Sequence, residues 1–401
     1  MPGPFRLWSV SRILRSQRTG PYIRGLAQLF AESSAIPSTM SQLLLRLEQV
    51  IGSSLDPVER AIASAKRACY LARVGRFSEV EVAITELRAV FGDGRSGRVT
   101  AWIMLAEGLL GLFERLSPKA FDRVFRSQFL GVALHDEDVL AVASAWKAHF
   151  EFEVSNFEAM TRSLRTVLAS ASDSSHEAMS RASMVLFNAY MLCGDRTEAQ
   201  RWFGLARNHS LSSGDQAGID ALIFNRAAFG VAWLRAARCS GEVRVDMLAA
   251  VRMEVNSARN LQQINGITAF AHLIDLSDAR LLMLEGKFER AIAGLQAVRR
   301  ASPFADYNFN QALIDLEVGY CWQRLGEVEA SLALVAEARA TSFSEMDIDD
   351  QLVAAWICRE LATGDRRLGD VAVAQAVFQE LEARYVLANE ALLTRLAEFR
   401  S

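Results

Sequence analysis

Residues 279–295, ARLLMLEGKFERAIAGL, decide the fold of this chain. The apolar helix that opens the stretch ends at Gly286, because glycine accepts the left-handed backbone that terminates a helix. Phe288 follows, and we expect its ring to fill the space between two paired helices. Ala279 and Ala291 are small enough to let those helices approach closely. The stretch therefore predicts two helices packed side by side and joined by a tight turn.

The same order of residues recurs along the chain. It is found in LARVGRFSEVEVAI from Leu71, EFEVSNFEAM from Glu151, YMLCGDRTEAQRWF from Tyr190 and CWQRLGEVEASLAL from Cys321, with a weaker copy, RRLGDVAVAQAVF, from Arg366. The equivalent turn positions are Gly75, Ser155, Gly194, Gly286, Gly326 and Gly369. Their steps are 80, 39, 92, 40 and 43 residues. The two long steps are read as double steps, with degenerate repeats near Arg115 and at Gly241. The pattern predicts about eight helix pairs with a period near 40 residues.

Composition supports a folded, helical chain. Of 401 residues, 51% are hydrophobic and 23% are charged, which excludes a disordered polymer. Apolar residues recur with helical spacing in segments such as Val58–Val74, and hardly any run alternates as a strand would. No stretch approaches the run of about 18 apolar residues that a membrane helix needs. A net charge of −3 disfavours binding of polyanions by the chain as a whole.

The small–glycine–aromatic–alanine order resembles the tetratricopeptide repeat over roughly residues 55–390. The period is longer than the standard 34 residues, and is similar to that of bacterial MalT-like and peptide-sensing regulators. The resemblance implies an all-α solenoid, a right-handed superhelix of about eight antiparallel helix pairs, with the first helix of each pair lining a concave groove. We expect a repeat domain over residues 40–401, with a capping helix near Ala388–Phe399. No helix-turn-helix or ATPase segment is recognisable at either end, so we expect this sequence to lack the effector part of such regulators.

The resemblance also implies which side chains face the groove, since the position six residues before each turn glycine points inward. That column and one neighbouring position give the candidate partner-binding residues His149, Asn188, Arg235, Arg280, Tyr320 and Arg324. Arginine there can bind a carboxylate through two parallel hydrogen bonds. The alternative is that the column is an ordinary solvated face, paired with acids such as Glu317.

The sequence offers little for catalysis. The loop Gly92–Arg98 lacks the lysine and the preceding strand of a phosphate-binding loop. The acidic run Asp347–Asp350 is read as the charged start of a helix, where anions suit the dipole. The five cysteines form no CxxC pair, so we read them as small apolar residues in a reducing compartment. We expect no enzyme activity, no cofactor, no metal and a cytoplasmic location.

Residues 1–39 differ from the rest, with five arginines and one acid. We read them as a poorly ordered basic arm, and Met40 as a possible alternative start. A membrane-surface or nucleic-acid helix and a transit peptide remain open readings.

Three functions follow in order of preference. The first is a bacterial adaptor that binds a peptide or protein segment in the groove. The second is a ligand-sensing or peptide-sensing regulatory module that acts on a partner effector chain. The third is nucleic-acid binding through the arm.

Overall fold

The computed structural model describes residues 41–400 except 93, 116–117, 173, 242, 266–270, 302–307, 340–342, 345 and 369. Within these ranges the chain forms seventeen α-helices, two short 3-10 helices and no strand. The elements are α3 (Gln42–Ser53), α4 (Pro57–Val74), α5 (Phe77–Phe91), α6 (Gly97–Arg115), α7 (Pro118–Leu134), α8 (Glu137–Glu153), α9 (Phe157–Ser170), α10 (His176–Leu192), α11 (Arg196–Ser213), α12 (Gln216–Ser240), α13 (Val245–Asn265), α14 (Ala271–Leu284), α15 (Phe288–Ala301), α16 (Asn308–Arg324), α17 (Val328–Arg339), α18 (Ile348–Gly364), η2 (Arg366–Leu368), α19 (Val371–Leu396) and η3 (Ala397–Phe399). The predicted all-α fold is confirmed, and the basic arm lies outside the described residues.

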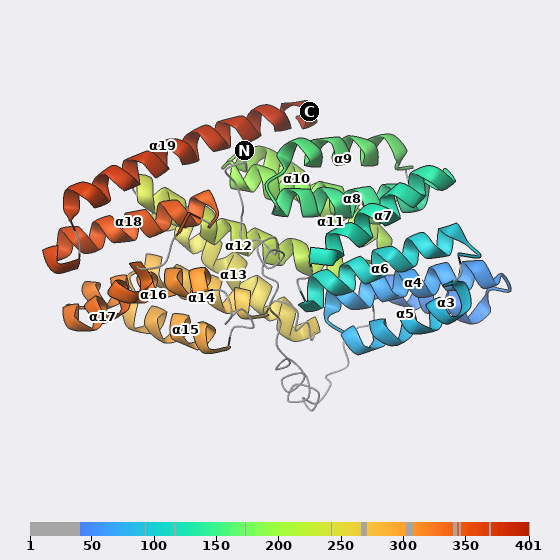
Figure 1. The fold of residues 1–401 in the computed structure, drawn as a ribbon, viewed down its shortest axis with the longest axis horizontal. Coiled ribbons are helices and arrows are strands. Elements are labelled where there is room, and N and C mark those ends of the chain that lie inside the picture. The colour runs from blue at the N-terminus through green and yellow to red at the C-terminus, as the bar shows by residue number, and fades with distance from the viewer. Residues whose placement is uncertain are drawn as a thin grey trace.

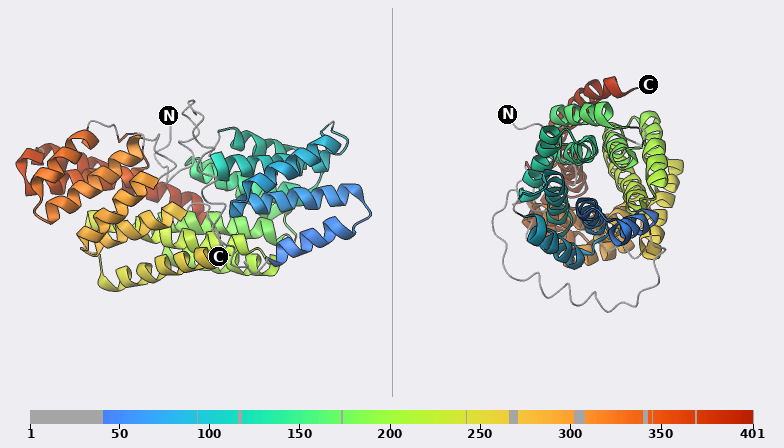
Figure 2. Two further views of the ribbon diagram at one scale, coloured as in Figure 1. Left: turned by 90° about the horizontal axis from the view of Figure 1, so that it is seen from below. Right: turned by 90° about the vertical axis from the view of Figure 1, so that its right-hand side faces the viewer.

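The helices form the expected solenoid (Figure 1). Helices α4 to α19 pack as eight successive pairs, from α4 with α5 to α18 with α19, and α3 packs against α4. The repeat spacing predicted two degenerate turns, near Arg115 and at Gly241. Both positions follow the end of a first helix, because α6 ends at Arg115 and α12 ends one residue before Gly241. Seen end-on, the pairs wind around a common axis (Figure 2).

The turns within the pairs have the backbone that the sequence pattern requires. Gly75, Gly194, Gly286 and Gly326 have φ between 75° and 87°, and Ser155 takes the same left-handed region at 55°. Glycine adopts this region without the penalty that a Cβ brings. The sixth predicted turn, at Gly369, lies outside the described residues.

Small residues allow the paired helices their close approach. Ala68, Ala148 and Ala279 are at most 1% exposed. At the equivalent Gly319, a Cβ would lie 2.7 Å from Cγ2 of Val335 on the partner helix α17. The contact between α16 and α17 at this position is thus too close to accept a single extra methyl group.

The first half of the solenoid, α3 to α11, closes against the start of α12. The Ser41 hydroxyl donates to the Gly214 carbonyl at 2.7 Å. Further along, Arg73 at the end of α4 holds Asp215, the N-cap of α12, through bonds of 2.7 and 2.8 Å. These contacts join residues 142 or more positions apart, so four pairs make one turn around the axis.

The second half, α12 to α19, closes in the same way. Arg235 of α12 donates to Asp350 of α18 at 2.9 Å. Helix α12 therefore borders both halves, with α4 and α10 on one side and α14 and α18 on the other.

The end of the chain differs from the expected capping helix. Residues 388–396 are the last turns of the 26-residue helix α19, which continues into η3. This end lies beside α9 and α10 (Figure 1), and the Tyr190 hydroxyl donates to the Leu396 carbonyl at 2.7 Å. Arg201 of α11 donates to the Phe399 carbonyl at 2.6 Å. The C-terminal helix thus joins the second half back to the first.

Two matched alanine substitutions test the turn assignment. Gly326 and Gly204 both have open space where a Cβ would go, but only Gly326 has positive φ. We expect Gly326→Ala to lower the free energy of unfolding by about 1 kcal/mol, because a side chain is strained in the left-handed region. Gly204→Ala, inside α11, should raise it by about 0.5–1 kcal/mol. Thermal unfolding followed by circular dichroism measures both, and equal shifts would contradict the assignment.

Candidate ligand-binding cavity

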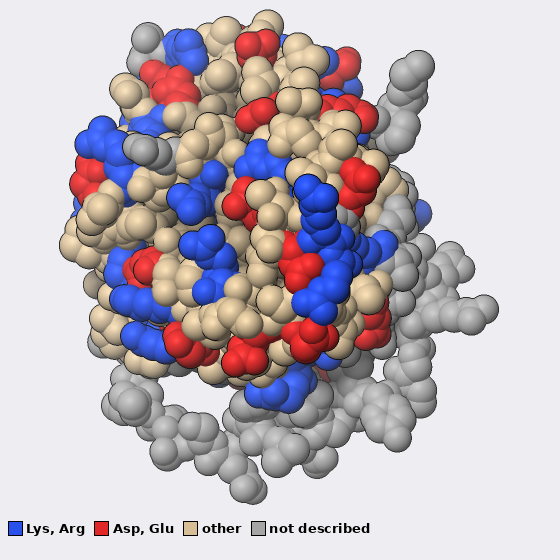
Figure 3. Space-filling model, turned by 90° about the vertical axis from the view of Figure 1, so that its left-hand side faces the viewer, with Lys and Arg blue, Asp and Glu red and all other residues tan. Residues whose placement is uncertain are grey.

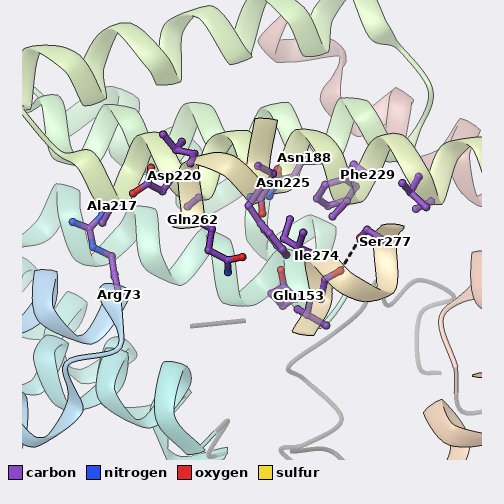
Figure 4. A pocket seen from close by; sticks show the side chains of 18 of the residues that line it. Arg73, Glu153, Asn188, Ala217, Asp220, Asn225, Phe229, Gln262, Ile274 and Ser277 are labelled. Atoms are coloured by element: carbon purple, nitrogen blue, oxygen red, sulfur yellow. Dashed lines mark hydrogen bonds between the residues drawn. The ribbon is translucent and has the colours of Figure 1, made fainter. Parts of the chain in front are cut away.

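The inner faces of the two halves enclose a cavity of about 210 Å³. Helices α8 and α10 supply one wall, and α12, α13 and α14 supply the others (Figure 4). Arg73 of α4 and Phe113 of α6 complete the lining. Helix α12 lines it from Ala217 to Arg235, with contacts recurring every three or four residues. Because a helix rises 1.5 Å per residue, the lined stretch is about 27 Å long.

Four of the six residues predicted for the groove lie on this wall: His149, Asn188, Arg235 and Arg280. The other two lie elsewhere. Tyr320 is buried, and its ring packs 5.3 Å from the ring of Trp356. Arg324 is exposed beside the ring of Phe288. That any of the six binds a partner stays a prediction.

The two predicted arginines already have acidic partners within the protein. Arg235 donates to Glu317 at 2.7 Å as well as to Asp350, and Arg280 lies 2.9 Å from the same Glu317 carboxylate. Glu317 is fully buried. The pairing with Glu317 raised above as an alternative therefore exists, but it is an internal ion network rather than a solvated face. These guanidinium groups close one end of the cavity with their charge neutralised.

Several cavity residues have no counterpart in the predicted column. Glu153, one helical turn after His149 on α8, lines the wall, and burial raises the pKa of its carboxyl to about 8. Burial also raises the pKa of Asp220 to about 6, and its Oδ2 has no hydrogen-bond partner within the described chain. Asn225 donates to Oδ1 of Asn188 at 3.3 Å across the α10–α12 contact.

Arg181 of α10 is a further charged group of the cavity lining. It is 7% exposed, and its guanidinium lies 3.8 Å from the centre of the Trp146 ring. Burial and the charge of Arg73 lower its pKa to about 9. Burial and the charge of Arg181 lower the pKa of His149 to about 3, so this imidazole is neutral at physiological pH, and its Nδ1 has no partner in the described part of the chain.

The arrangement suits binding of a polar ligand. An apolar wall with a few fixed polar groups is typical of ligand sites. The Asn188 and Asn225 amides offer both donors and acceptors, as a peptide backbone requires. Glu153 and Asp220 hold carboxyl groups whose protonation is easily changed by a neighbouring charge.

The other motifs have structural roles. Gly92–Arg98 joins α5 to α6, and Arg98 pairs with Asp136, which caps α8. Asp350 of the acidic run is buried in the ion pair with Arg235 rather than serving only to charge a helix start. Helix α12 is, within the described ranges, the one helix long and apolar enough to cross a membrane, and in this fold it forms the cavity wall.

Comparison with known proteins supports the fold. No protein-family model and no curated protein matches the chain. Among solved structures, it is similar to the crystal structure of a Rap protein complexed with competence and sporulation factor. The TM-score is 0.50 with 13% identity, over 86% of this chain and 93% of that chain. An identity this low shows the fold alone, a tetratricopeptide-like α-solenoid.

The raised pKa of Glu153 predicts a pH-dependent stability. Since the folded chain keeps this proton up to about pH 8 and the unfolded chain loses it near 4.5, Glu153 lowers stability as the pH rises through that interval. We expect Glu153→Gln to raise the melting temperature at pH 8 by about 2 °C. At pH 4 the difference should vanish. Thermal unfolding across this range measures it. Glu158→Gln, which removes an exposed ion pair with Arg162, is the control. If Glu153→Gln changed the melting temperature equally at pH 4 and pH 8, the prediction would be wrong.

Proposed function

We propose that the protein is a non-enzymatic, cytoplasmic interaction protein that binds a peptide or polypeptide segment along α12, inside the solenoid. The observation that carries this proposal is the cavity, whose wall combines apolar side chains with the amides of Asn188 and Asn225 and with ionisable groups. Its lined length of about 27 Å would hold about eight residues of extended chain, at 3.3 Å each. The complex of the similar Rap protein with competence and sporulation factor agrees with a fold that binds partners.

The size of the cavity favours a sensing role as the second candidate. About 210 Å³ is less than the roughly 300 Å³ at which pockets for drug-sized ligands begin. A full extended segment therefore requires the walls to separate. Because α8 and α10 belong to the first half and α13 and α14 to the second, separation changes how the halves meet. Binding would thus alter the curvature of the solenoid, which is the kind of change that a regulator of a partner chain needs.

Nucleic-acid binding is the third candidate, and it rests on the arm of residues 1–39. On the end face formed by the last pairs, Lys and Arg are interspersed with Asp and Glu (Figure 3). Arg367 on η2, for example, pairs with Glu329 and Asp365. This face therefore adds no basic surface to the arm.

A cavity-filling substitution tests peptide binding. Ala228 lines the cavity from α12, so Ala228→Trp should occupy the space that a ligand needs. Immobilised full-length protein is incubated with randomised octapeptides, and retained peptides are measured by mass spectrometry. We expect wild type to retain peptides and Ala228→Trp to lose at least about 90% of them, a tenfold or greater weakening.

Ala376→Trp, at an exposed position of α19, is the matched control and should bind as wild type does. Circular dichroism verifies that all three proteins are equally helical. Retention by none of them, or equal retention by Ala228→Trp, would overturn the proposal. Small-angle scattering with a retained peptide then separates the two roles, since a sensor changes its radius of gyration and a rigid scaffold keeps it.

A further inference from the structure

Arg181 is a buried cation without an acidic partner in the described protein. Only 7% of it is exposed, and the one hydrogen bond of its guanidinium is to the Met184 sulfur at 3.3 Å, a weak acceptor. A guanidinium carries five N–H donors, and a buried charge is costly unless it is paired. Most of the capacity of Arg181 to donate is therefore unused.

The acidic groups near Arg181 are committed to other partners. Asp215 accepts both bonds from Arg73 and also caps α12 through the Gly218 amide at 3.0 Å. Glu177 lies one helical turn before Arg181 on α10, but no ion pair joins the two, and burial raises the pKa of Glu177. None of these carboxyl groups neutralises Arg181 directly.

The other arginines of the same cavity differ on this point. Arg73 is held by Asp215, and Arg235 and Arg280 share Glu317. Of the four cavity arginines, Arg181 alone lacks a carboxylate among the residues that the structure describes. All four arginines line one cavity, so burial alone does not explain why Arg181 has no carboxylate partner.

The surroundings leave Arg181 ready to bind a planar anion. The guanidinium carbon lies over the Trp146 ring, 3.8 Å from its centre, where the π-system attracts the cation. Neutral His149 lines the same cavity, with its Nδ1 unpartnered within the described ranges. Two parallel N–H donors on one edge match the two oxygens of a carboxylate.

We propose that Arg181 binds a carboxylate of the peptide segment, either its C-terminal group or an Asp or Glu side chain. This inference rests on the proposed function. It also places the carboxylate relative to the peptide backbone. Asn188 follows Arg181 by seven residues on α10, about 10 Å along the helix. An extended chain covers that distance in about three residues. The carboxylate therefore lies about three residues from the point where the Asn188 and Asn225 amides contact the peptide backbone.

The test uses four randomised octapeptide pools and the full-length protein. The pools either contain or lack Asp and Glu, and they carry either a free or an amidated C-terminus. Wild type should retain at least one carboxylate-bearing pool about 10- to 100-fold more strongly than the pool without any carboxylate. Preference for the free C-terminus assigns the terminal group, and preference for the acidic pool assigns a side chain.

Arg181→Gln should lose this preference while still retaining peptides, and Arg181→Lys should keep part of it, since lysine has the charge without the fork of donors. If wild type binds all four pools equally, or if Arg181→Gln keeps the full preference, the inference is wrong while peptide binding stands. If wild type retains none of the pools, the proposed function itself fails. Should Arg181→Gln not fold, Arg181→Lys decides, because a preference equal to that of wild type would overturn the inference.

Discussion

The ion network around Glu317 is the interaction on which the second half of the solenoid depends. Its carboxylate, fully buried on α16, is shared by Arg235 of α12 and Arg280 of α14, and Arg235 reaches on to Asp350 of α18. Four inner helices therefore meet at one set of charges. Burying such charges is expensive, and removing one partner costs about 3–5 kcal/mol because the others are left unpaired. The network holds α18 against α12, and that contact sets the direction in which α19 leaves toward the first half.

Much of the fold could be predicted from the sequence because the turn signal is local. Each turn glycine adopts a left-handed backbone conformation that is set by the few residues around it and not by distant contacts. These glycines are Gly75, Gly194, Gly286 and Gly326. Closure into two turns could not be predicted in this way. The contacts that make it, such as Arg73 with Asp215 and Arg235 with Asp350, join residues 142 and 115 positions apart and follow no repeat spacing.

The site was accessible to sequence reasoning only in part. Choosing one residue in each repeat from the sequence correctly put His149 and Asn188 on the cavity wall. Residues three or four positions apart lie on the same face of a helix, however, so each chosen residue has neighbours that also face the cavity. Glu153, four residues after His149, and Arg181, seven before Asn188, share those faces and were missed. Extending the column by one or two turns could have found them. Tyr320 could not have been separated from the others, because its place against Trp356 depends on how α16 meets α18.

The end of α19 has a consequence for how this architecture can change over evolution. A solenoid with free ends can gain or lose a repeat at little cost, because each repeat contacts only its neighbours. Here Leu396 and Phe399 must meet Tyr190 and Arg201, four pairs earlier. Deleting or duplicating any pair between them would move those groups out of reach. The number of repeats in this segment is therefore fixed by geometry, and the contact of Arg73 with Asp215 fixes the number between α4 and α12 in the same way.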